Sequence, residues 1–263
     1  MPSTEIIFMP AFSIVIICKN EADIIGRSLD GLLGITDDII VYDNGSTDGT
    51  PDIVKNYPVR LYNGKWEGFG NTKNAANELA KYDWILSLDA DETLDDELKR
   101  NLKQLPLNQD IEVFRFSFLN FLGDRPLRYG DWGNDKHIRL FNRKKVSWDM
   151  EAVHEKLLLP EQAVIKNVEG KILHCTWRNK ADYKNKMERY AELGAKKYLK
   201  QGKHGGRLRQ IFSPSIAFIK SYLLKLGFLD GKAGFTCAGM MAYYTKRKYE
   251  LFRKLKMEQE ARK

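Results

Sequence analysis

The fold is decided by a buried strand that ends in two acids, Trp84-Ile-Leu-Ser-Leu-Asp-Ala-Asp91. Its apolar residues follow one another without polar alternation, which is typical of a strand covered on both faces of a parallel sheet. Two similar runs precede it, Phe12-Ser-Ile-Val-Ile-Ile17 and Asp38-Ile-Ile-Val-Tyr-Asp43. Helix-like stretches at about 21–33 and 71–81 separate the three strands. This alternation predicts a doubly wound α/β sheet, whose ligands lie beyond the carboxyl ends of the strands.

Acidic residues follow two of these strands, in 43–48 and in Asp89-Ala-Asp91. Where a strand ends and the chain turns, two such carboxylates can approach one divalent cation. Mg²⁺ or Mn²⁺ then takes its other ligands from water and phosphate oxygens. The alternative is that the acids open the next helix. The segment Thr93-Leu-Asp-Asp96 fits a helix N-cap, so we assign its acids to that helix and the earlier pair to a metal–diphosphate site.

Composition excludes several classes of protein. The 263 residues are 43% hydrophobic and 30% charged, as in an ordinary globular chain. Three cysteines (Cys18, Cys175 and Cys237) suit neither a disulfide framework nor a zinc site, which indicates a reducing compartment. We find no signal-peptide pattern and no uncharged run of the roughly 20 apolar residues that a membrane span needs. The sequence therefore predicts a cytoplasmic protein.

The second half of the chain has a different pattern. A helix is expected over 182–200, and the expected strands are 111–118, 136–142, 145–148 and 171–177. We therefore predict one catalytic domain over 1–204, with a donor half at about 10–105 and an acceptor half at about 106–204. A separate helical region follows over 205–263.

Positive charge gathers at the end of the chain. From Lys200 onward 15 Lys+Arg oppose 4 Asp+Glu, a net charge of +11, whereas the whole chain carries +8. Within this region 208–229 combines cations with large apolar residues, which predicts an amphipathic segment in the headgroup plane of an anionic membrane. The alternative is a helical hairpin packed on the body with a solvated basic face, and both can hold together. With no recognised RNA- or DNA-binding motif, we expect no nucleic-acid partner.

Three motifs in order resemble one enzyme family. They are Ser13-Ile-Val-Ile-Ile-Cys-Lys-Asn-Glu-Ala22, Val41-Tyr-Asp-Asn-Gly-Ser-Thr-Asp-Gly-Thr50 and the strand ending at Asp91. Together they resemble family 2 glycosyltransferases, which have the GT-A fold: a Rossmann-like, nucleotide-sugar-binding mixed sheet. The resemblance implies an inverting, metal-dependent transfer from a nucleotide-diphosphate sugar.

A narrower resemblance is to lipopolysaccharide-core β-glucosyltransferases of the WaaE type. It is carried by Trp66-Glu-Gly-Phe-Gly-Asn-Thr-Lys-Asn-Ala75, Val153-His-Glu155 and Lys225-Leu-Gly-Phe-Leu-Asp-Gly231. It implies glucose from a UDP-sugar and a glycolipid acceptor, the lipopolysaccharide inner core, reached by a peripheral protein at the inner face of the cytoplasmic membrane. The open alternatives are polyprenyl phosphate, capsule or another glycan as acceptor, or a non-catalytic protein that binds nucleotide sugar or lipid.

The resemblance also implies roles on the donor side. The nucleotide-sugar residues would be Asn20, Glu21, Asp43, Lys73 and Asp89. A carboxylate in the position of Asp43 can accept hydrogen bonds from base or ribose, although the following Asn-Gly pair is also typical of a plain turn. A lysine in the position of Lys73 suits a diphosphate oxygen, and the alternative is a solvated helix face.

Metal, base and acceptor roles complete the predicted site. Asp89 and Asp91 would bind the metal, and His174 is a candidate third ligand against the alternative of a hydrogen-bonded core histidine. Inverting transfer needs a base for the acceptor hydroxyl; among Glu151, Glu155, Asp131 and Asp135 we favour Glu155. The predicted acceptor-side residues are Asp131, Trp132 and His154.

Overall fold

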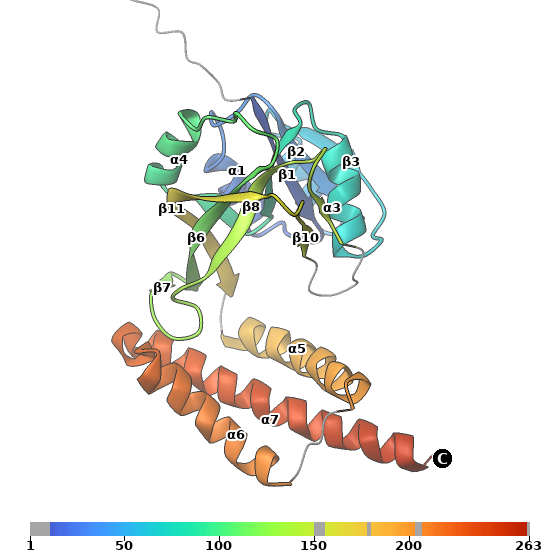
Figure 1. The fold of residues 1–263 in the computed structure, drawn as a ribbon, viewed down its shortest axis with the longest axis vertical. Helices are drawn as coiled ribbons and strands as arrows, with labels where there is room; N and C mark the ends of the chain where they lie inside the picture. Colours follow the sequence, from blue (N-terminus) through green and yellow to red (C-terminus); the bar gives the residue numbers. More distant parts are fainter. Residues whose placement is uncertain (1–10, 150–155, 178–179, 203–206, 262–263) are drawn as a thin grey trace, which may run out of the picture. The chain divides into compact units, whose positions relative to one another are not determined.

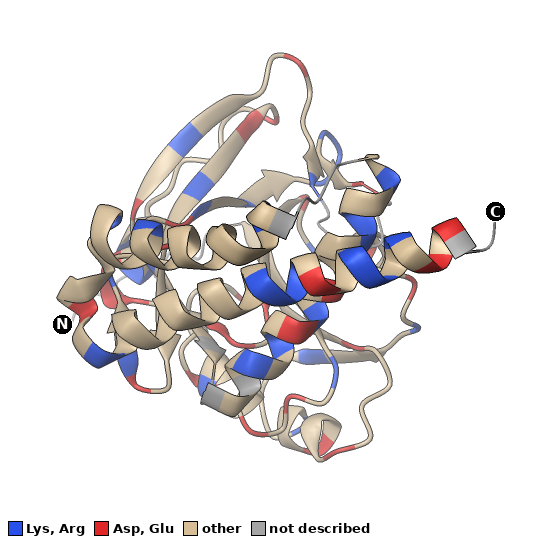
Figure 2. Cartoon of the chain, turned by 90° about the horizontal axis from the view of Figure 1, so that it is seen from below, with Lys and Arg blue, Asp and Glu red and all other residues tan. Residues whose placement is uncertain are grey.

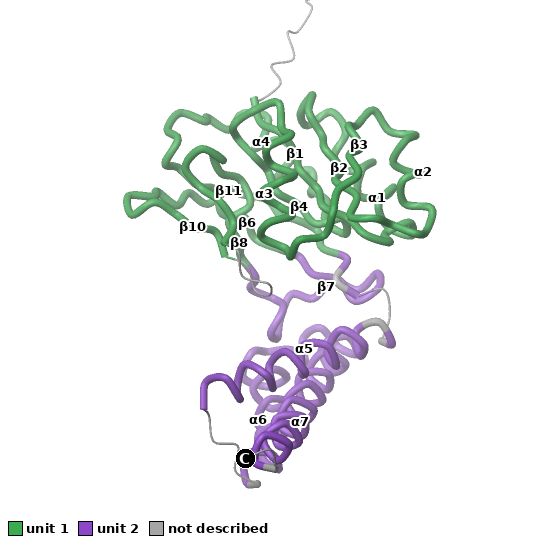
Figure 3. The backbone as a smooth tube through the Cα atoms, turned by 90° about the vertical axis from the view of Figure 1, so that its right-hand side faces the viewer, with its two compact units in different colours: residues 1–118, 136–174 green, residues 119–135, 175–263 purple. Residues whose placement is uncertain are grey.

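A computed structural model describes residues 11–149, 156–177, 180–202 and 207–261. The chain forms two compact units, coloured separately in Figure 3. Unit 1 consists of Met1–Phe118 and Lys136–His174, and unit 2 of Leu119–Asp135 and Cys175–Lys263. The predicted boundary at residue 204 therefore falls inside unit 2, because the helix before it packs with the helices after it.

Among the described residues, nine strands form one sheet (Figure 1), in the order β3-β2-β1-β4-β8-β6-β11-β5, with β7 paired to β6. A separate two-stranded sheet joins β9 to β10. The strands are β1 (Phe12–Cys18), β2 (Ile39–Asp43), β3 (Arg60–Asn63), β4 (Trp84–Asp89), β5 (Glu92–Leu94), β6 (Glu112–Leu122), β7 (Arg125–Leu127), β8 (Lys136–Asn142), β9 (Ser147–Trp148), β10 (Leu157–Leu158) and β11 (Val164–Trp177).

The centre of the sheet is parallel, as the apolar runs predict. Strand β1 lies between β2 and β4 and pairs with both in parallel. Strand β8 then pairs with β4 in the opposite sense, so that Asn142 lies opposite Trp84. The amino end of β8 and the carboxyl end of β4 therefore meet at the same edge of the sheet. This edge also holds the carboxyl ends of β1 and β2.

Side chains of β1 alternate between two cores, because successive residues of a strand point to opposite faces. Phe12, Ile14 and Ile16 belong to one core, and Val15 and Ile17 to the other. Helices α1 (Ile25–Asp30), α2 (Thr50–Val54) and α4 (Asp96–Lys103) add apolar residues to the first core, and α3 (Phe69–Glu78) to the second. The sheet is thus covered on both faces.

Helix α4 begins later than the pattern in the sequence predicts. For α4 the cap is Asp95, whose carboxylate accepts a hydrogen bond from the backbone N–H of Leu98 at 2.8 Å. Thr93 lies instead in β5, opposite Leu173 of β11. The extra strand moves the helix start two residues beyond the predicted threonine.

Unit 2 is mainly helical. It contains α5 (Lys180–Lys200), α6 (Arg207–Ile219), a π-helical turn (Lys220–Leu224), a 3-10 turn (Gly227–Asp230) and α7 (Gly231–Ala261). Both α5 and α6 pack along α7 (Figure 1). The core of the unit includes Trp177, Tyr183, Met187 and Cys237. The indole of Trp177 stacks on the phenol ring of Tyr183, with ring centroids 3.9 Å apart.

The turn between α6 and α7 is closely packed, and we call residues 208–235 the hairpin. A Cβ atom on Gly234 would lie 1.8 Å from the carbonyl oxygen of Gly227. The Asp230 carboxylate accepts hydrogen bonds from the backbone N–H groups of Arg128 and Tyr129, both at 2.9 Å. These contacts fix the turn between the two helices.

Apolar side chains cover the outside of the hairpin. More than half of the exposed large apolar residues of the described chain lie there: Leu208, Ile211, Phe212, Ile216, Ile219, Leu223, Leu224, Leu226, Phe228, Leu229 and Phe235. In Figure 2 the helix that ends at the C-terminus is largely uncoloured over its first half and charged over its second. Among the described residues no single helix is long and apolar enough to cross a membrane. One pair, Leu208–Leu224 with Gly227–Glu260, meets that requirement together but is bent by 74°.

Candidate active site

Hydrogen bonds join the loops that follow β1 and β2. Asn20, which has a left-handed backbone (φ +58°), accepts a hydrogen bond from the N–H of Thr47 at 2.8 Å and donates its own N–H to the Ser46 hydroxyl at 2.8 Å. The N–H of Glu21 donates to the Thr50 hydroxyl at 2.8 Å. The two predicted nucleotide-binding loops therefore form one connected frame.

The buried Asp43 stabilises the turn that follows β2. It is 2% exposed, and its carboxylate accepts hydrogen bonds from the N–H groups of Gly45 (3.2 Å) and Ser46 (3.0 Å). Next to it Asn44 is 5% exposed and donates its side-chain amide to the carbonyl of Cys18 at 3.2 Å. The buried Oδ1 atom of Asn44 accepts no hydrogen bond within the described part of the chain. Asp43 thus forms the turn, and nucleoside contact stays a prediction for it.

The motif at the start of α3 brings Trp148 to the same edge. The Asn74 side chain donates to the carbonyl of Trp148 and accepts from its N–H, both at 2.9 Å, as a neighbouring strand would. Gly70 allows this approach, since a Cβ atom there would lie 1.7 Å from the carbonyl oxygen of Asp149. Trp148 in turn covers Lys73, whose Nζ lies 4.6 Å from the centre of an indole ring.

At the end of β4 two cations hold Asp89. Lys73 Nζ lies 3.2 Å from Oδ1, and Arg139 Nη2 lies 3.1 Å from Oδ2. The same Arg139 nitrogen lies 2.5 Å from the carboxylate of Glu92, which is fully buried and also accepts the N–H of Asp89 at 3.0 Å. The side chains of Lys73 and Arg139 are 4% and 9% exposed, whereas that of Asp89 is 38% exposed. Asp89 is therefore the accessible member of a buried ionic cluster.

Opposite effects set the pKa values of the two carboxyls. Burial alone would raise the pKa of Asp89, but the charges of Lys73 and Arg139 outweigh it and hold this pKa well below its ordinary value. For Glu92, burial and the negative charge of Asp89 raise the pKa, against the attraction of Arg139. The cluster thus keeps a carboxylate at the surface of the site, with positive charge behind it.

Asp91 and His174 form the second acidic group. His174 Nε2 lies 3.4 Å from Asp91 Oδ2, and each side chain is 22% exposed. Burial lowers the pKa of His174, but the hydrogen bond to Asp91 and the nearby carboxylates raise it above its ordinary value overall. His174 therefore lies beside Asp91, and its role as a metal ligand stays a prediction.

These groups fit a cation that takes most of its ligands from elsewhere. Among the described residues no group of three or more His, Cys, Asp and Glu side chains is placed to hold a metal ion by itself. Two partly exposed carboxylates beside an imidazole do suit Mg²⁺ or Mn²⁺ when diphosphate oxygens and water complete the shell. Asp89, Asp91 and His174 would be the residues that hold it.

A pocket of about 510 Å³ in unit 1 opens beside Asp89. Lys73, Asp89, Arg139 and Trp148 line one part of it. Arg139 and Trp148 were not predicted, because each reaches the site from a strand far away in the sequence. Glu92 was not predicted either, and its only local signal was its position next to Asp91.

The remaining predicted residues belong to unit 2 or fall outside the described residues. Glu151, His154 and Glu155 fall outside the described residues. Asp131 and Trp132 belong to unit 2, where Asp131 forms an ion pair with Lys225. The indole N–H of Trp132 donates to the Tyr183 hydroxyl at 3.1 Å, and its ring meets Trp177 edge-on at 4.5 Å. Their acceptor-side role stays a prediction.

Comparison with known proteins identifies the family. The family model described as Glycosyl transferase family 2 matches residues 13–113, the part of the chain that contains the three motifs. The lipopolysaccharide core biosynthesis glycosyltransferase LpsC of Rhizobium meliloti (strain 1021) is 31% identical over 242 residues, covering 88% of each chain. The chain belongs to glycosyltransferase family 2. An uncharacterized family relative from Rickettsia typhi is 29% identical over 89% of this chain and 84% of its own.

The fold of this glycosyltransferase agrees with the family. The expected GT-A arrangement, a mixed sheet with helices on both faces and a helical C-terminal region, is confirmed. Solved structures with partial similarity include glucosyl-3-phosphoglycerate synthase from Mycobacterium tuberculosis in complex with Mn²⁺, UDP and glucosyl-3-phosphoglycerate. It is 20% identical, with a TM-score of 0.35, over 43% of this chain and 44% of that one.

Proposed function

We propose that this family 2 glycosyltransferase moves a sugar, glucose, from a UDP-sugar to a membrane glycolipid, the lipopolysaccharide inner core, in a metal-dependent inverting reaction. The observation that carries the proposal is the ionic cluster at the end of β4. A partly exposed Asp89 between two buried cations, with Asp91 beside it, suits a nucleotide diphosphate and its metal ion.

The strand order arranges the parts of the donor along one edge. The connected loops after β1 and β2 would hold the nucleoside. Lys73 and Arg139 place positive charge where the leaving diphosphate gains negative charge. A bound metal ion would add Lewis-acid stabilisation of that diphosphate. Glu155, in the segment after β9, would take the proton of the acceptor hydroxyl.

Two observations support a membrane glycolipid as acceptor. The relative LpsC is named for lipopolysaccharide core biosynthesis. The hairpin of unit 2 exposes a row of large apolar side chains together with the exposed cations Arg209, Lys220, Lys225 and Lys232. An apolar face with cations beside it matches an interfacial segment on anionic lipid. We therefore place the enzyme at the inner face of the cytoplasmic membrane.

The test is a comparison of Asp91→Ala with Asp96→Ala, a matched control whose carboxylate is 88% exposed on α4. Calorimetry with a panel of nucleotide-diphosphate sugars, with Mn²⁺ and then with chelator, measures donor binding. Radiolabel transfer to lipopolysaccharide with a truncated core measures activity. We expect Asp91→Ala to lose at least 100-fold in transfer with unchanged thermal unfolding, and Asp96→Ala to match the wild type. Full transfer by Asp91→Ala contradicts the metal assignment, and donor binding without transfer or hydrolysis on any acceptor indicates a non-catalytic protein.

A further inference from the structure

The pocket beside Asp89 is strongly cationic. It lies within unit 1, and every cation that lines it comes from α3, β6, β8 or the residue before β10. Its charged lining residues are Lys73, Asp89, Arg115, Lys136, Arg139 and Lys156. Among the described residues, five cations and one carboxylate thus line the pocket, and that carboxylate already pairs with Lys73 and Arg139.

Strand order places Arg115 and Lys136 beyond the proposed site of the donor diphosphate. From the nucleoside loops the edge runs from β2 through β1 and β4 to β8 and β6. Lys136 is the first residue of β8 and lies opposite Ser117 of β6, while Arg115 lies opposite Ile138. These residues are therefore on the side of Asp89 away from the nucleoside. In an inverting transfer the acceptor approaches the sugar from the side opposite the leaving diphosphate, so this is the acceptor's part of the pocket.

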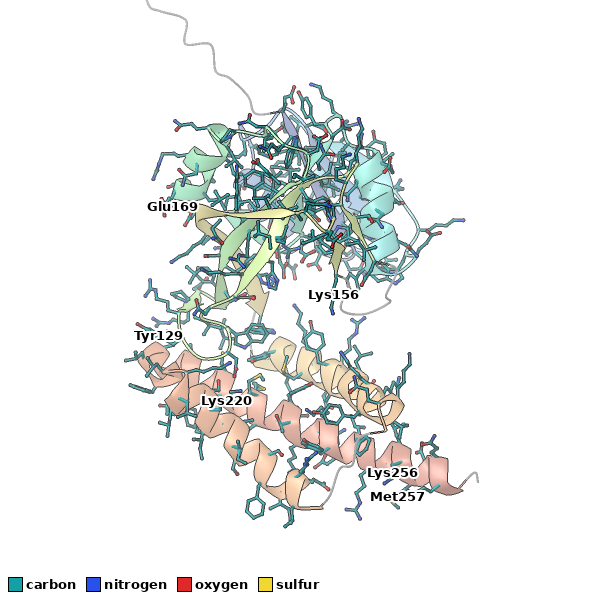
Figure 4. The ribbon with its side chains drawn as sticks, in the orientation of Figure 1. Tyr129, Lys156, Glu169, Lys220, Lys256 and Met257 are labelled. Carbon is teal, nitrogen blue, oxygen red and sulfur yellow. The ribbon has the colours of Figure 1, made fainter. Side chains whose placement is uncertain are left out.

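The described residues do not neutralise the charge on that side. Lys136 and Lys156 (the latter labelled in Figure 4) form no ion pair with any described acid. Arg115 donates through Nε to the amide oxygen of Asn167 at 2.9 Å, which orients its guanidinium without cancelling its charge. The indole N–H of Trp148, which lines the same pocket, is buried without a hydrogen-bond partner among the described residues. Three cations that no described acid neutralises are suited to an anionic ligand.

We propose that Arg115, Lys136 and Lys156 bind an anionic group of the acceptor, a phosphate or a carboxylate close to the hydroxyl that receives the sugar. Arg115 provides a planar donor for either anion, and the two lysines provide point charges. The inference rests on the proposed function, because it assigns an acceptor to that reaction. The anionic group is then required for recognition of the acceptor, so the enzyme would discriminate against the same glycan without its anionic group.

The kinetic test uses two variants and modified acceptors. Arg115→Ala/Lys136→Ala is compared with Lys103→Ala, an exposed lysine of α4 that serves as control. The acceptor is used intact, after phosphatase treatment, and after reduction of its carboxyl groups, which distinguishes the two anions. We expect the double variant to raise the acceptor KM at least tenfold while the donor KM changes less than twofold. One of the two treatments should raise the wild-type acceptor KM similarly and abolish the difference between wild type and variant. An unchanged KM after both treatments overturns the proposal.

A binding test does not need a working acceptor. The full chain is saturated with UDP and Mn²⁺ and titrated calorimetrically with inorganic phosphate at constant ionic strength. We expect phosphate to bind, the Arg115→Ala/Lys136→Ala variant to bind at least tenfold more weakly, and Lys103→Ala to bind as the wild type does. Equal binding by wild type and double variant, no phosphate binding at all, or displacement of UDP by phosphate overturns the inference. Failure of transfer with phosphate binding intact would instead point to the proposed function as the error.

Discussion

The hairpin of unit 2 offers a direct test of membrane binding. Leu224 and Leu229 are 75% and 53% exposed, so replacing both with serine should leave the folded state of the protein almost unchanged. Full burial of a leucine side chain contributes about 1.5–3 kcal/mol. Scaled by the exposed fractions, the two side chains together would contribute about 2.5 kcal/mol of transfer into lipid. Since about 1.4 kcal/mol is a factor of ten, we expect membrane partitioning of Leu224→Ser/Leu229→Ser to fall by roughly 60-fold.

Flotation with vesicles that contain anionic phosphatidylglycerol measures this partitioning. The matched control is Val164→Ser/Ile165→Ser, which removes two similarly exposed apolar side chains from unit 1 (43% and 46%) and should change binding less than twofold. Added salt should weaken wild-type binding without abolishing it, because only the contribution of the cations is screened. A loss below threefold in the hairpin variant, or an equal loss in the control, refutes the assignment of the hairpin as the membrane-binding surface.

Two further predictions concern buried groups. Arg139→Met leaves the carboxylate of Glu92 buried without its partner, so the free energy of unfolding measured in urea should fall by about 3–5 kcal/mol. Adding Glu92→Gln should recover at least half of this loss. A loss below about 1 kcal/mol would argue against the buried ion pair. Cys18 and Cys237 are buried, and burial raises the pKa of Cys237 to about 12, whereas Cys175 is partly exposed. At pH 8 a colorimetric disulfide reagent should therefore modify one thiol in the native protein and three in denaturant, and rapid reaction of three native thiols would contradict the described packing.

Local patterns predicted the donor half of the fold well. The strand ending at Asp89 and the runs beginning at Phe12 and at Asp38 are observed as β4, β1 and β2. Each is fully or almost fully buried, so its continuous apolar sequence was informative by itself. The predicted capping threonine, Thr93, was less informative, because it belongs to a short strand.

Local sequence patterns did not predict the contacts between segments that are distant in the sequence. The sequence indicated that Asp89 follows a strand, but not that Arg139, fifty residues later, would lie beside it. That contact depends on β8 pairing antiparallel with β4, and strand pairing follows from the whole sheet rather than from either strand alone. The short strands β5, β7 and β10 were missed for a related reason. Two or three residues carry too little alternation to be recognised.

The close contact between Gly227 and Gly234 has a consequence for how the hairpin would meet lipid. Many surface-active peptides are disordered in water and fold at the bilayer, so that part of their binding energy is lost in ordering the chain. Here the turn is already held by close backbone packing, and Asp230 binds the N–H groups of a neighbouring loop. The backbone of the hairpin therefore loses its conformational entropy when the protein folds, and not when it binds a membrane. The apolar face would therefore reach a membrane preorganised, and little of the proposed binding energy would be used to order the backbone.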